Sequence, residues 1–221
     1  MIGKVVESLV RVARPIILEM FNKDSCIAST RIAIDALRYF GIAAVPMALS
    51  ATIYNACAVE EFGQGEAITS IANFQSALRV NEPSGAWSVM IGTGLSEKDP
   101  NNPTWAGHLV AVIPETTVLI DLAIDQASRP SKSIDLEPFC LQIPQKEWWK
   151  GTDPIVEFTD ISGSLLVLDR RCPDPSGYLS SPNWNVPPEY VDDFDFITNK
   201  VIHAMCLDMG LSPPTPHTKD V

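Results

Sequence analysis

Three side chains with complementary chemistry occur along the chain in the order cysteine, histidine, aspartate: Cys26, His108 and Asp121. A cysteine thiolate is a strong nucleophile, a histidine takes and returns protons near neutral pH, and a carboxylate orients an imidazole. Each residue also has an ordinary alternative, because a cysteine beside Ile27 and Ala28 is often a small core residue. The prediction of a shared site therefore depends on the elements that would bring the three side chains together.

Cys26 is predicted to open a helix that runs to about Phe40. Asp24 or Ser25 can cap this helix, and Gly41 is a natural residue to end it. The start of a helix favours the thiolate form of a cysteine, because the helix dipole and the free backbone N–H groups stabilise negative charge there. The position of Cys26 thus fits a nucleophile.

His108 and Asp121 are predicted to lie on one antiparallel hairpin. Residues 108–113 are apolar and β-branched, residues 114–116 form a short turn, and residues 117–122 return as a second strand. His108 starts the first strand and Asp121 is near the end of the second. The two side chains are therefore expected at the same end of the hairpin, where the carboxylate could orient the imidazole.

This arrangement resembles the transglutaminase-like branch of the papain-like cysteine enzymes. In that family a cysteine opens a helix that ends in L-R-x-x-G-I-x-A, here Leu37 to Ala44, and the histidine and aspartate follow on successive strands. The similarity covers about residues 20–125. It implies a catalytic triad with Cys26 as nucleophile, His108 as general base and acid, and Asp121 as the orienting group. It also implies a thioester intermediate, with water or an amine as acceptor.

The chain departs from the family pattern in ways that matter for this expectation. The long interval between Cys26 and His108 requires an insertion within residues 57–105. Leu109 stands where the family has an aromatic residue, and Leu122 stands where it has a proline. These departures keep open the alternative of a catalytically inactive member.

Acyl chemistry also needs donors for the oxyanion that develops on the carbonyl oxygen. The backbone N–H of Cys26 can be one donor. Asn22 lies just upstream and is the best side-chain candidate, whereas Gln126 is a weaker choice. Asp125 and Gln126 are held in reserve for the orienting role of Asp121.

The rest of the chain predicts an α+β fold in which N-terminal helices pack on an antiparallel sheet, as in a papain-like or transglutaminase-like core. Apolar side chains at helical spacing indicate a helix over 2–21, which Pro15 should kink or split. We expect a single domain over 1–211 with its core at about 20–170, and a flexible tail over 212–221. The other expected elements are one or two buried strands over 42–57, strands over 86–91 and 164–169, a short helix or irregular insertion over 68–74, and a C-terminal helix over 189–209.

Charge and cysteine content narrow the class of protein. The formal net charge is −11, and because residues 1–81 are neutral overall, the whole excess falls on residues 82–221. An acidic protein of this kind is a poor candidate for binding nucleic acid or an anionic membrane. The uncharged stretch 39–59 is better explained by buried strands than by a membrane span. Five widely spaced cysteines without a CxxC motif favour reduced thiols and a cytoplasmic location.

We expect no cofactor and no metal. His203 and Cys206 share one face of the last helix, but two ligands do not make a metal site. The acidic run Asp192, Asp193 and Asp195 falls at a helix start, where the helix dipole favours acids.

The sequence thus predicts a cysteine hydrolase (a thiol protease, for example) or acyltransferase that acts on a peptide, protein or amide substrate. The main alternative is an inactive binding or adaptor protein whose acidic C-terminal surface meets a basic protein partner. A weaker alternative is a small-molecule carrier with a pocket in the N-terminal block.

Overall fold

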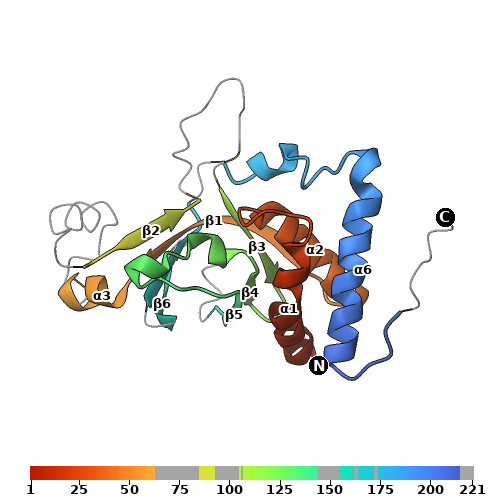
Figure 1. Ribbon diagram of the computed structural model, residues 1–221, viewed down its shortest axis with the longest axis horizontal. Helices are drawn as coiled ribbons and strands as arrows, with labels where there is room; N and C mark the ends of the chain where they lie inside the picture. Colours follow the sequence, from red (N-terminus) through yellow and green to blue (C-terminus); the bar gives the residue numbers. More distant parts are fainter. Residues whose placement is uncertain are drawn as a thin grey trace.

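The computed structural model describes residues 1–62, 85–92, 105, 107–143, 155–161, 164–171 and 174–214. The fold is α+β, as predicted. Three helices stand together at one side of an antiparallel sheet and pack on one another: α1 (Ile2–Ile17), α2 (Cys26–Tyr39) and α6 (Val191–Asp208) (Figure 1). α2 covers strand β3 (His108–Ile113), so the helix that carries Cys26 lies against the strand that carries His108.

The described sheet has seven strands, which run in the order β5-β4-β3-β1-β7-β6, with β2 paired to β1. The other strand bounds are β1 (Val45–Tyr54), β2 (Ser88–Ile91), β4 (Val118–Asp121), β5 (Phe139–Gln142), β6 (Ile155–Ile161) and β7 (Ser164–Asp169). Each pairing is antiparallel. The predicted hairpin of residues 108–122 is confirmed as β3 and β4.

Strand β1 holds the curled sheet together. Its first half pairs with β3, with Leu49 opposite His108, and its second half pairs with β2 and β7. Much of the uncharged stretch 39–59, which was considered as a membrane span, forms this strand. Pro46 lies near the start of the strand. Among the described residues, no helix has the length and apolarity needed to cross a bilayer. The prediction that the strand reaches residue 57 is wrong, because helix α3 (Ala56–Phe62) begins directly after Asn55.

The helices form where they were predicted but are shorter than predicted. α1 buries the apolar stripe Val5, Val6, Leu9, Ala13 and Ile17. Pro15 lies inside this one helix, which ends two residues later instead of reaching residue 21. α2 ends at Tyr39, one residue before the predicted end, and Gly41 follows as predicted with a φ of +74°, which is unstrained only for glycine, and with its N–H donating to the Arg38 carbonyl.

Two apolar clusters form most of the core. The larger one lies between the helices and the sheet, and it joins α1, α2 and α6 to side chains of β3 and β4. The second lies on the other face, where β1, β3, β4 and β7 meet the 3₁₀ turn η3 (Ile124–Ala127). Residues 63–84, which include the predicted element over 68–74, and residues 215–221 of the predicted tail lie outside the described residues.

Candidate active site

The structure brings His108 and Asp121 into direct contact at one end of the β3–β4 hairpin. His108 Nε2 and Asp121 Oδ2 are 2.6 Å apart, and each side chain is 1% exposed. The backbone N–H of Ala123 donates to the second carboxylate oxygen, Oδ1, over 2.9 Å. Both oxygens of Asp121 therefore have a defined partner, which fixes the carboxylate in the plane where it meets the imidazole.

Cys26 is the first residue of α2 and lies beside the hairpin. It is 8% exposed and packs with Ala48, Leu109 and Ala123, the last two being neighbours of His108 and Asp121 in the chain. One turn further along α2, the Thr30 hydroxyl donates to the Leu109 carbonyl over 2.8 Å. This hydrogen bond ties the start of α2 to the start of β3, and it sets the distance between the elements that carry thiol and imidazole.

The electrostatics of His108 link all three residues. Burial lowers the pKa of the imidazole, but the charge of Asp121, its hydrogen bond, and the side chain of Cys26 raise that pKa more, to about 10. The imidazole of His108 thus interacts with both a carboxylate and a thiol, as does a group that takes a proton from a nucleophile.

The comparisons give no relative. No protein-family model, no curated protein and no solved structure matches this chain. The resemblance to transglutaminase-like enzymes therefore remains a prediction from the sequence.

Of Asp125 and Gln126, the two residues considered as alternatives to Asp121, Gln126 contacts the imidazole of His108. It lies on η3, and its Nε2 is 2.8 Å from His108 Nδ1, on the side of the ring opposite Asp121. Asp125, the other residue held in reserve, does not contact His108; it pairs with Arg14 over 2.7 Å. Asn22 is exposed in the turn before α2, and no hydrogen bond in the described part of the chain connects it to His108 or Cys26. Its oxyanion role stays an untested prediction.

Arg14 is a supporting residue that the sequence reasoning missed. Its side chain is 5% exposed on α1, and its guanidinium pairs with Asp125 and donates to the hydroxyls of Ser25 and Ser29 and to the Lys23 carbonyl. Ser25 was predicted to cap α2, but its hydroxyl makes no capping bond and accepts from Arg14 instead. Arg14 therefore connects the residue before Cys26 to the residue before Gln126. The sequence signal that could have identified Arg14 is the presence of an arginine next to the apolar stripe of α1.

Three aromatic side chains lie near Cys26. Trp105, Tyr178 and Trp184 pack on the cluster that contains Cys26, and their rings meet edge to face. The segment of residues 174–190 that carries two of them passes above the starts of β3 and α2 before it enters α6 (Figure 1). Arg31 of α2 donates to the Trp184 carbonyl and so anchors this segment.

Gly92, at the end of β2, makes room for His108. Its φ is +76°, and a Cβ there would lie 2.4 Å from the Leu49 carbonyl oxygen and 2.7 Å from the His108 nitrogen. The sequence reasoning placed Gly92 in a loop and assigned it no role. A glycine directly after a strand is the local signal of such a close approach.

Gly92→Ala is expected to lower the free energy of unfolding by about 3 kcal/mol, because backbone strain at positive φ adds to overpacking. Gly41→Ala is the matched control: its φ is +74°, but nothing lies within 4 Å of the added Cβ, so it should cost only about 1 kcal/mol. Urea unfolding of the two variants measures the difference. Equal losses would mean that Gly92 does not contact His108 as described.

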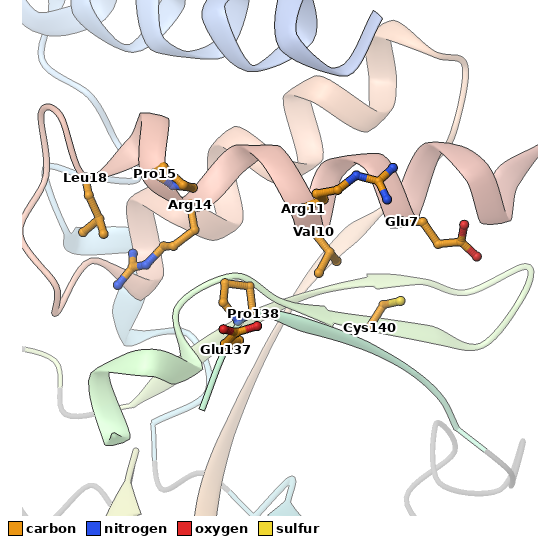
Figure 2. Close-up of a pocket in the computed structure, with 9 residues that line it drawn as sticks. All are labelled: Glu7, Val10, Arg11, Arg14, Pro15, Leu18, Glu137, Pro138 and Cys140. Carbon is orange, nitrogen blue, oxygen red and sulfur yellow. The ribbon is translucent and has the colours of Figure 1, made fainter. Parts of the chain in front are cut away.

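A groove between α1 and β5 contains none of the three triad residues. It has a volume of about 720 Å³ and is lined by residues of α1 and by Glu137, Pro138 and Cys140. Figure 2 shows Arg11 and Arg14 leaving α1 in opposite directions, and Arg14, which lines the groove, also donates to the Ser25 hydroxyl next to Cys26. Among the described residues, no group of three His, Cys, Asp or Glu side chains is arranged to hold a metal ion.

Proposed function

We propose that this protein is a cysteine-dependent acyl-transfer enzyme that acts on an amide, peptide or isopeptide bond, as a hydrolase or an amidotransferase. Cys26 is the nucleophile, His108 the general base and acid, and Asp121 the orienting carboxylate. The observation that carries the proposal is the buried His108–Asp121 pair, 2.6 Å apart, with Cys26 acting on the same imidazole. The resemblance of residues 20–125 to transglutaminase-like enzymes supports it.

The reaction follows from these positions. Cys26 gives its proton to His108, and the thiolate attacks the carbonyl carbon of the substrate. The oxyanion collapses, the leaving amine takes the proton from His108, and a thioester remains on Cys26. Water or an amine then attacks the thioester, with His108 acting again as base. A peptide or protein substrate and a cytoplasmic location belong to this proposal, since the thiol needs a reducing environment.

The test compares two cysteines of the same chain. Cys57 is exposed, and Cys26 is 8% exposed, so accessibility alone makes iodoacetamide modify Cys57 first. Activation by His108 is expected to reverse this order, because the thiolate is the reactive form. Mass spectrometry of peptides from briefly treated protein measures both rates.

His108→Ala is the matched variant for this experiment. It should slow alkylation of Cys26 and leave that of Cys57 unchanged, since only Cys26 is next to the imidazole. If Cys26 reacts no faster than Cys57 and does not respond to His108→Ala, the enzyme proposal is wrong.

A second candidate function rests on the burial of the site. Cys26 is 8% exposed, and Trp105, Tyr178 and Trp184 pack on its cluster, an arrangement that also fits an inactive binding or adaptor protein. The function would then belong to the acidic C-terminal part, where Asp193 and Asp195 lie exposed on α6 and could meet a basic protein partner. This candidate predicts an unreactive Cys26 in the alkylation experiment, so the same measurement distinguishes the two.

A further inference from the structure

We propose that Arg14 is a positioning residue of the reaction: its guanidinium holds the start of α2, which carries Cys26, against η3, which adjoins His108. The inference rests on the proposed function and adds to it a residue that acts through other residues. Its starting point is that the side-chain partners described for Arg14 fall into two groups. One group lies before and within the first turn of α2, and the other lies in η3.

The first group fixes the segment that leads into Cys26. Arg14 Nη1 donates to the Ser25 hydroxyl over 3.1 Å, and Arg14 Nη2 donates to the Lys23 carbonyl over 2.6 Å. Ser25 directly precedes α2; its φ of −106° and ψ of 38° are not helical, and its side chain makes no capping hydrogen bond. The bonds from Arg14 therefore hold the backbone at the point where Cys26 begins the helix.

The second group connects the same guanidinium to the surroundings of His108. Arg14 Nη2 pairs with Asp125 Oδ1 over 2.7 Å, and the two side chains are 5% and 16% exposed. The next residue of η3, Gln126, contacts the imidazole, with 2.8 Å between Gln126 Nε2 and His108 Nδ1. η3 thus contacts His108 through one residue and Arg14 through the residue before it.

The shape of the guanidinium makes this connection rigid. Arginine presents five N–H donors in a planar fork, whereas lysine has one nitrogen at the end of a flexible stem. Because the fork is rigid, it sets the distance between the start of α2 and η3, and so contributes to the distance between Cys26 and His108. Catalysis depends steeply on such distances, since a displacement of about 1 Å can cost about 10²-fold in rate.

Arg14→Lys is the variant that tests this role. It keeps a positive charge for Asp125 and removes the fork, so we expect the fold to be retained while the start of α2 is held less firmly. Acylation of Cys26 by p-nitrophenyl acetate, followed by mass spectrometry, is expected to slow about 10²-fold. Alkylation of the exposed Cys57 by iodoacetamide is expected to stay unchanged.

Ser25→Ala and Ser29→Ala form a matched pair for the same experiment. Both hydroxyls are buried, and both accept from Arg14 Nη1 over 3.1 Å, so the two variants should shift the urea midpoint by similar amounts. Only Ser25→Ala is expected to slow acylation, about 10-fold, because it frees the backbone directly before Cys26. Ser29 lies within α2 and is held by the backbone hydrogen bonds of the helix.

The titration of His108 is a readout that a purely stabilising role of Arg14 would not change. The side chains of Asp121 and Cys26 both raise the pKa of His108. If Arg14→Lys moves Cys26 away from the imidazole, the contribution of Cys26 is lost and the pKa of His108 falls, while the contribution of Asp121 remains. NMR titration of the unmodified protein and of the variant measures this change.

An unchanged acylation rate or an unchanged His108 pKa in Arg14→Lys would overturn the inference, and so would equal acylation rates in the two serine variants. If Arg14→Lys does not fold, the two serine variants decide the question. A Cys26 that is unreactive in the unmodified protein would overturn the proposed function, and this inference with it.

Discussion

Asp121→Asn is expected to lower the rate of acylation of Cys26 about 10⁴-fold, with the fold retained, because it reverses the tautomer of His108. The Ala123 N–H donates to Oδ1 of Asp121, so the oxygen of an asparagine is held at that position and its NH₂ group faces His108 Nε2. The neutral ring then carries its hydrogen on Nδ1, whereas Asp121 favours the hydrogen on Nε2.

The same substitution is expected to lower the pKa of His108. In the unmodified protein that pKa is raised from 6.5 to about 10, since the charge and hydrogen bond of Asp121 outweigh burial. Without the carboxylate, burial is the largest remaining effect, and it favours the neutral ring. The chain has three histidines, so an NMR titration of the imidazole carbons resolves them, with His108→Ala to identify the signal.

Stability should follow this titration in a defined pH range. The pKa of His108 is higher in the folded than in the unfolded state, so protonation of His108 stabilises the fold. This contribution is complete below pH 6.5 and is lost as the pH rises from 6.5 to about 10. Asp121→Asn should remove that dependence. Asp135→Asn is the control, because it removes one negative charge at an exposed position. If both variants have the same acylation rate and the same pH dependence, Asp121 does not orient His108.

Arg14→Met is expected to lower the free energy of unfolding by about 3–5 kcal/mol, as for other buried ion pairs that lose one partner. The Arg14 and Asp125 side chains are 5% and 16% exposed, so the carboxylate left behind has little access to water. The hydroxyls of Ser25 and Ser29 and the Lys23 carbonyl also lose a donor. Urea unfolding measures the loss.

Arg11→Met is the matched control on the same helix. Arg11 pairs with Asp208 over 2.6 Å, but its side chain is 62% exposed and water replaces the lost partner, so little change in stability is expected. If both variants lose a similar amount of unfolding free energy, burial does not make the Arg14–Asp125 pair contribute more to stability than the exposed Arg11–Asp208 pair. Asp125→Asn combined with Arg14→Met should recover part of the loss, because no uncompensated charge then remains.

Much of the scaffold followed from patterns between residues a few positions apart. The capping candidates Asp24 and Ser25, with Gly41 at the other end, predicted α2, and the β-branched runs around residues 114–116 predicted the β3–β4 hairpin; both elements are confirmed. The hairpin also predicted that His108 and Asp121 would meet, since antiparallel strands return to the same end. These features depend on local conformation, which the order of side chains determines.

The surroundings of the triad were decided by tertiary structure. Gln126 was already a candidate because it lies close to Asp121 in the chain, but only the position of η3 decides that its amide meets Nδ1 and not Nε2. Arg14 and Trp184 reach the same region from α1 and from the segment before α6. Nothing in their local sequence specifies this, because contacts between distant segments depend on how the helices pack against the sheet. The sequence by itself thus determined the elements and the order of the three reactive groups, whereas long-range packing decided which side chains surround them.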